Sequence, residues 1–60
     1  MKGITVEHKG FILQQGSHST HYMLFDANTE RLLMFCSCTA YLTEEEAKEH
    51  IEHFIKIREG

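Results

Sequence analysis

Two cysteines and two histidines have a spacing that could hold a metal ion. Cys36 and Cys38 stand two residues apart at the end of an apolar segment, and His50 and His53 stand three apart in a helical one. Residues two apart on a strand share a face, as do residues three apart on a helix, so each pair can converge on one point. Thiolate sulfur and imidazole nitrogen are common zinc ligands in proteins. The sequence therefore predicts a structural zinc ion bound by these four side chains.

The order of these residues also has a parallel in a known family. Cys-x-Cys, eleven residues and His-x-x-His resembles a shortened C2H2 zinc-finger pattern. In that family, two cysteines from a hairpin and two histidines from the next helix bind zinc tetrahedrally. The segment from Cys36 to His53 has only one residue between its cysteines and two between its histidines, which is shorter than the family spacing. The resemblance implies the ligand set alone, without a DNA-reading helix.

Other assignments of these side chains stay open. His18 and His21 repeat the His-x-x-His spacing on a predicted loop, and His8 lies near the first predicted turn. Any of these three could replace a helical histidine as a ligand. The two cysteines could instead be small core residues, with exposed histidines on the helix. A disulfide between them would be strained, and a reducing compartment would oppose it.

The pattern favours binding over catalysis. Four protein ligands would close the coordination sphere, whereas a catalytic zinc ion keeps one position open. His50-Ile-Glu-His53 also differs from the His-Glu-x-x-His motif of metalloproteases. A cysteine nucleophile would need an orienting group and an oxyanion site, which the sequence does not indicate. We therefore expect a binding protein without enzymatic activity. A small metalloenzyme stays open as the third functional hypothesis, after two binding functions.

Four short strands are predicted before the helix. Alternating or continuous apolar residues predict strands over 4–8 and 11–15, joined at Lys9-Gly10. A second pair is predicted over 21–25 and 31–38, joined across 26–30, where Asp26 and Asn28 favour a turn. These two hairpins predict a four-stranded antiparallel sheet.

One C-terminal helix follows the sheet. Thr43 and Glu46 form a Thr-x-x-Glu capping box, acidic residues crowd the first turn, and Gly60 closes the segment. An apolar stripe at helical spacing should lie on the sheet; it contains Ala47, Ile51, Phe54 and Ile55. The predicted fold class is α+β, with a ββββα order stapled by zinc, in a single small domain over residues 1–60.

Size and charge limit the classes of partner. A chain of 60 residues has a marginal core, which favours a metal or a second subunit. The net charge is −3 and the six basic residues are scattered, so direct nucleic-acid binding is disfavoured. No apolar run is long enough to span a membrane, and no segment has the pattern of a signal peptide. We therefore expect a cytoplasmic protein.

Both faces of the predicted sheet carry apolar side chains, and one helix can cover only one of them. The interface candidates are Tyr22, Leu24, Leu33 and Phe35. They favour a protein partner, with a homodimer as a further option. Acidic domains of this size without a catalytic motif are typical of phage or mobile-element accessory proteins that inhibit host enzymes, including anti-CRISPR inhibitors of nucleases. The alternative is a nucleic-acid-linked regulatory zinc protein.

Overall fold

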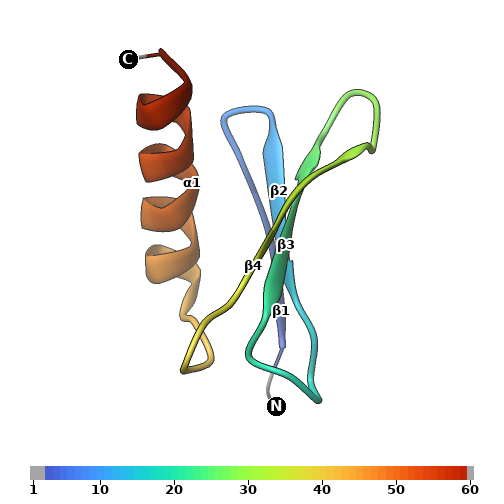
Figure 1. Cartoon of the computed structure of the whole chain (residues 1–60), viewed down its shortest axis with the longest axis vertical. Helices are drawn as coiled ribbons and strands as arrows, with labels where there is room; N and C mark the ends of the chain where they lie inside the picture. The colour runs from blue at the N-terminus through green and yellow to red at the C-terminus, as the bar shows by residue number, and fades with distance from the viewer. Residues whose placement is uncertain (1–2, 60) are drawn as a thin grey trace.

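The computed structural model describes residues 3–59 and has the predicted order of four strands and one helix (Figure 1). The strands are β1 (Ile4–His8), β2 (Phe11–Gln15), β3 (Tyr22–Asp26) and β4 (Leu32–Cys36), and the helix is α1 (Glu44–Glu59). The first two strands have their predicted bounds, β3 is displaced by one residue, and β4 is shorter than predicted at both ends. Gly60, the predicted end of the helix, lies outside the described residues.

The strands form one antiparallel sheet in the order β1-β2-β3-β4. His8 pairs with Phe11, so Lys9 and Gly10 form a two-residue turn between β1 and β2. Both turn residues have positive φ, 52° for Lys9 and 84° for Gly10, as a type I′ turn requires. Its twist matches that of the flanking strands, which is why a two-residue connection suffices here.

The second hairpin turns on the side chain of Asp26. Its carboxylate accepts hydrogen bonds from the backbone amides of Asn28, at 2.8 Å, and Thr29, at 3.2 Å. This local bonding is the reason that Asp initiates turns. The β3–β4 register then shifts between Leu24 and Phe25, so Leu32 of β4 stands opposite Phe25.

The capping box predicts the start of α1 correctly. The backbone amide of Glu46 donates to Thr43 Oγ1 at 3.2 Å, and the amide of Thr43 donates to Glu46 Oε1 at 2.9 Å. Both of these amides would otherwise lack a partner at the helix N-terminus. Within residues 3–59, no helix is long and apolar enough to cross a membrane.

The core lies between α1 and one face of the sheet. Val6, Leu13, Leu24 and Met34 stand side by side across the four strands, and Ile51 of α1 is fully buried. The buried apolar residues are Val6, Leu13, Tyr22, Leu24, Ala47 and Ile51. The helix packs against β1 and β2, whereas β4 crosses in front of β3 in Figure 1 without a segment over it. This leaves β4 the least covered strand.

Candidate functional site

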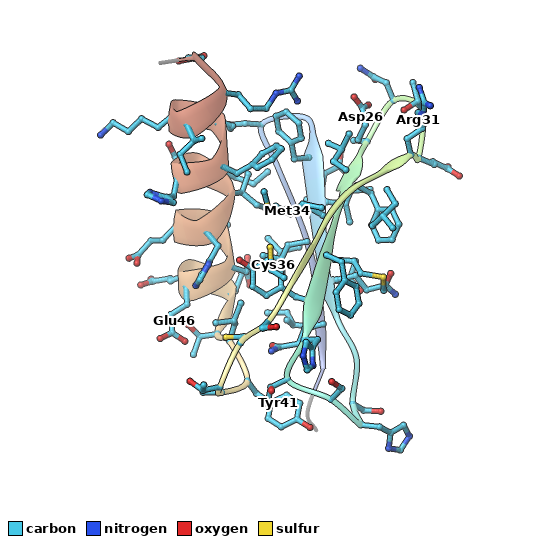
Figure 2. The ribbon with its side chains drawn as sticks, in the orientation of Figure 1. Asp26, Arg31, Met34, Cys36, Tyr41 and Glu46 are labelled. Carbon is cyan, nitrogen blue, oxygen red and sulfur yellow. The ribbon has the colours of Figure 1, made fainter. Side chains whose placement is uncertain are left out.

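The two cysteines lie where the sheet passes into the helix connection. Cys36 is the last residue of β4 and stands opposite Tyr22 of β3. Figure 2 shows Cys36 and Met34 on the side of β4 that faces α1. Cys38 lies two residues further on, and its thiol donates to the backbone oxygen of Ala40 at 3.2 Å. Both are free, half-buried thiols that pack against the core.

The two helical histidines have different surroundings. His50 is half-buried, and its Nδ1 lies 2.9 Å from the hydroxyl of Tyr22. The two rings also meet edge to face, with centroids 5.2 Å apart. His53 is exposed and lines a surface depression together with Lys9 and Glu52. The two imidazoles stand three positions apart on α1, but His50 is held by Tyr22 and His53 is open to solvent.

Tyr22 is the centre of this cluster. Its hydroxyl contacts His50, and burial, followed by the contact with the Cys36 thiol, raises the pKa of Tyr22 well above its ordinary value. The Cys38 thiol is close enough to act in the same direction. The structure thus gathers Cys36, Cys38 and His50 around one phenol. We call these four residues the Tyr22 cluster.

The four predicted zinc ligands are not arranged as a metal centre in the described part of the chain. Across residues 3–59, no group of three or more His, Cys, Asp or Glu side chains is arranged to hold a metal ion. The predicted ligands Cys36, Cys38 and His50 approach Tyr22, and His53 lies outside this cluster. The zinc site and its four ligands therefore stay a prediction.

The alternative histidine ligands have other surroundings. His8 Nε2 lies 2.9 Å from a carboxylate oxygen of Glu52 on α1. His21 Nδ1 lies 2.9 Å from the hydroxyl of Ser19, and its ring stacks on Phe35 with a centroid distance of 5.6 Å. His18 is exposed in the β2–β3 connection. These contacts direct His8 toward α1 and His21 toward the sheet face opposite α1.

The interface prediction needs a correction. Tyr22 and Leu24 are buried beneath the helix and belong to the core, so they are not available to a partner in this structure. Leu33 and Phe35 are exposed, as predicted. The register explains the difference, because Tyr22 and Leu24 stand opposite Cys36 and Met34, whereas neighbouring strand residues point to the other side. The prediction combined residues from the two faces.

The sheet face away from α1 is largely apolar on its β3–β4 side. Met23 stands opposite Phe35, and Phe25 stands opposite Ile12. We call this set the outer face; it contains Ile12, Met23, Phe25, Leu32 and Phe35. Ile12 and Phe25 also line a shallow hollow with the exposed Glu30. The outer face can thus offer apolar contact beside an acidic side chain.

One residue that the sequence analysis missed joins the strands to the helix connection. Gln15 is only 2% exposed. Its amide nitrogen donates to the backbone oxygens of Thr20, at 2.6 Å, and Ala40, at 3.0 Å, while its oxygen accepts from the amide of Leu42 at 2.8 Å. The alternation Phe11, Leu13, Gln15 places it on the core-facing side of β2, and that signal could have identified it.

Comparison with protein-family models, with curated proteins and with solved structures finds no match. The two features that can carry an argument are the Tyr22 cluster and the outer face.

Proposed function

We propose that this chain is a protein-interaction module that acts by covering a surface on another protein. The observation that carries the proposal is the outer face, where Phe35 is 62% exposed and stands opposite Met23, and where Leu32 is 55% exposed. Contiguous apolar surface of this kind is uncommon on monomeric proteins and marks interaction sites. An aromatic side chain at its centre would supply a large share of the binding free energy.

The charge of the chain favours a partner with a basic surface. The net charge is −3, and the exposed acids Glu7 and Glu30 lie beside the outer face. Opposite potentials accelerate association and exclude wrong partners. Nucleases carry basic surfaces because they bind nucleic acid. The proposal is thus an inhibitor of a host enzyme, of the kind made by phages or mobile elements and including anti-CRISPR proteins, with a nuclease as target.

Two exposed apolar residues allow a matched test. Phe35 and Ile57 are both 62% exposed, but Phe35 lies on the outer face and Ile57 on α1. A partner is first isolated with the tagged chain and then purified separately. We expect Phe35→Ser to weaken its 1:1 complex by at least about tenfold, as loss of an aromatic anchor does. Ile57→Ser should bind and inhibit like the wild type.

Two results would contradict this proposal. Equal binding of the purified partner by wild type and Phe35→Ser would remove the outer face from the interface. Binding to DNA that weakens steeply with salt, without a protein partner, would support the nucleic-acid-linked regulator instead. Metal-dependent turnover of a small substrate would support the metalloenzyme.

A structural zinc ion is the second part of the proposal. Its support is the approach of Cys36, Cys38 and His50 to the same phenol. Zinc binding would require His53 to turn toward the cysteines and His50 to present a free ring nitrogen. The hydrogen bond to Tyr22 contributes about 1 kcal/mol, whereas structural zinc contributes roughly 10 to 16 kcal/mol in small domains. A rearrangement of this size is therefore energetically accessible.

Elemental analysis tests the zinc proposal directly. The purified chain should contain one zinc ion per molecule, and chelation should lower its melting temperature. Cys38→Ser and His53→Ala should each lose the metal and melt like the chelated wild type. Absence of metal, with melting unchanged by chelation, would overturn the site and return both cysteines to the core.

A further inference from the structure

The outer edge of β4 is an unpaired edge of the described sheet, and its side chains are mostly exposed. Within residues 3–59, β4 pairs with β3 on one edge and with no strand on the other. An unpaired edge presents a row of amide and carbonyl groups that can bind another strand. In Figure 1, β4 lies at the front of the sheet and nothing stands in front of it.

The side chains of β4 offer little of the usual protection for such an edge, whose irregularity is the register shift opposite Leu24 and Phe25. Its sequence, Leu32-Leu-Met-Phe-Cys36, has no charge and no proline. Leu32 is 55% exposed and Met34 is 39% exposed, and the register places Leu32, opposite Phe25, on the same face as Phe35. By contrast, the other edge strand, β1, contains the charged Glu7 and ends at His8, which contacts Glu52. Charge on an edge strand opposes pairing with another chain.

We infer that two copies of this chain pair through β4 in antiparallel orientation and form one continuous eight-stranded sheet. A two-fold axis perpendicular to the sheet at Met34 would place Met34 opposite its own copy. The same axis would bring Leu32 and Leu33, at the register shift of β4, beside Phe35 and Cys36 of the second copy. Every cross-strand contact in this register is apolar, so the strand is complementary to itself.

Charge favours this orientation over the alternatives. In the antiparallel orientation, Glu30 and Arg31 of one copy lie beside the uncharged Ser37 and Cys38 of the other, so no like charges meet. A parallel in-register pair would place each Arg31 and each Glu30 beside its own copy, which is repulsive. The acidic first turn of α1 lies outside this strand. The β4 edge is therefore a surface on which a chain of net charge −3 can meet a second copy without repulsion.

The geometry of the fold accommodates the second copy. Rotation about this axis keeps both helices on the same side of the joined sheet. Each α1 packs on β1 and β2 of its own copy, two strands away from the new contact. The pairing joins the two outer faces into one larger apolar surface. It stands independently of the proposed inhibitor function, because it rests on the strand edge and needs no other partner.

The oligomeric state in reducing buffer tests this inference, since a reductant excludes disulfides between the free cysteines. Sedimentation equilibrium should give a mass that rises with concentration from 7.0 kDa toward twice that value. Met34→Lys would place two ammonium groups opposite each other, and it should weaken the dimer at least about tenfold. Leu32→Lys, at a more exposed position, tests the same contact with less risk to folding. Ile57→Lys is the matched control and should leave the dimer unchanged.

Three results would overturn the inference. The first is a wild-type mass of 7.0 kDa throughout the sub-millimolar range. The second is a dimer that both β4 variants leave intact while their circular dichroism matches the wild type. The third is a dimer that only Ile57→Lys weakens, because the interface would then lie on the helix. Loss of the dimer with retained partner binding would separate this contact from the proposed function.

Discussion

The Tyr22 hydroxyl lies 2.9 Å from Nδ1 of His50 and joins β3 to the middle of α1. Tyr22 is buried, and its ring meets the imidazole edge to face. A polar group that leaves water has to find a partner, because an unsatisfied buried group costs about 1 to 3 kcal/mol. His50 and Tyr22 satisfy each other. The contact therefore gives His50 a structural role in this structure.

Substitution of the two helical histidines should have unequal effects in metal-free protein. We expect His50→Ala to lower the free energy of unfolding by about 1 to 2 kcal/mol, because the Tyr22 hydroxyl loses its hydrogen bond to the imidazole. His53→Ala is the matched control at an exposed position, and it should change stability by less than about 0.5 kcal/mol. Urea denaturation in the presence of a chelator measures both. Equal losses would mean that His53 is also held by a contact or a metal.

A double-mutant cycle isolates the contribution of this hydrogen bond. Tyr22→Phe removes the hydroxyl and keeps the ring that packs in the core. If the two side chains act as a pair, Tyr22→Phe combined with His50→Ala should cost less than the sum of the single substitutions. Strict additivity would show that the two residues contribute independently.

Gln15 should be the most sensitive polar residue of the sheet. Its replacement by Ala would leave the backbone groups of Thr20, Ala40 and Leu42 without their partner. We expect a loss of about 2 to 4 kcal/mol in urea denaturation. Gln15→Met keeps most of the volume but none of the hydrogen bonds, so it should be nearly as damaging. The neighbouring Gln14 is exposed, and Gln14→Ala is the control. Recovery of stability by Met would show that volume matters more than bonding.

The sequence predicts the elements better than it predicts the site. The order of strands and helix follows from local patterns, namely apolar alternation, the Lys9-Gly10 turn and the capping box at Thr43. The contact between Tyr22 and His50 depends on residues 28 positions apart, and no local pattern contains it. Spacing alone indicates that His50 and His53 share a helix face. It does not indicate that a side chain of the sheet, Tyr22, contacts His50 and leaves His53 exposed.

The two faces of the sheet illustrate a second limit. A strand with apolar residues at every position, such as Leu32–Cys36, gives no indication of which side faces the core. The assignment of Tyr22 and Leu24 to an interface failed for this reason. The answer comes from pairing, because Leu24 aligns with Leu13 and Val6 beneath the helix. The pairing register depends on contacts between strands, so the apolar pattern of one strand does not predict its buried face.

The capping box at the start of α1 should contribute measurably to stability. Thr43→Ala removes the oxygen that accepts from the amide of Glu46. We expect a loss of about 1 kcal/mol, the usual effect at an N-cap. Thr39→Ala changes the same residue type in the exposed β4–α1 connection and should have little effect. Thr43→Ser keeps the hydroxyl but lacks the methyl group, so it should retain most of the stability. A loss as large as that of Thr43→Ala would mean that the methyl contact matters more than the hydrogen bond.

Acid should weaken the contact between α1 and the first hairpin. Glu52 accepts hydrogen bonds from His8, at 2.9 Å, and from Lys9, at 3.0 Å. These bonds, that of His8 first, hold the pKa of the Glu52 carboxyl below its ordinary value. A depressed carboxyl pKa stabilises the folded state above the pKa of the unfolded chain, about 4.3 for Glu, and this stabilisation disappears as pH falls through the folded value.

Glu52→Gln therefore tests the acid dependence. Near neutral pH, the variant should be less stable than the wild type, by a small amount because Glu52 is exposed to solvent and salt. As pH falls from about 5 to about 3, the difference in urea midpoint between the two proteins should shrink. Glu49→Gln, an exposed acid one turn earlier, is the control and should show less change in this range. A difference that stays constant with pH would mean that Glu52 acts through its shape and hydrogen bonds rather than through its charge.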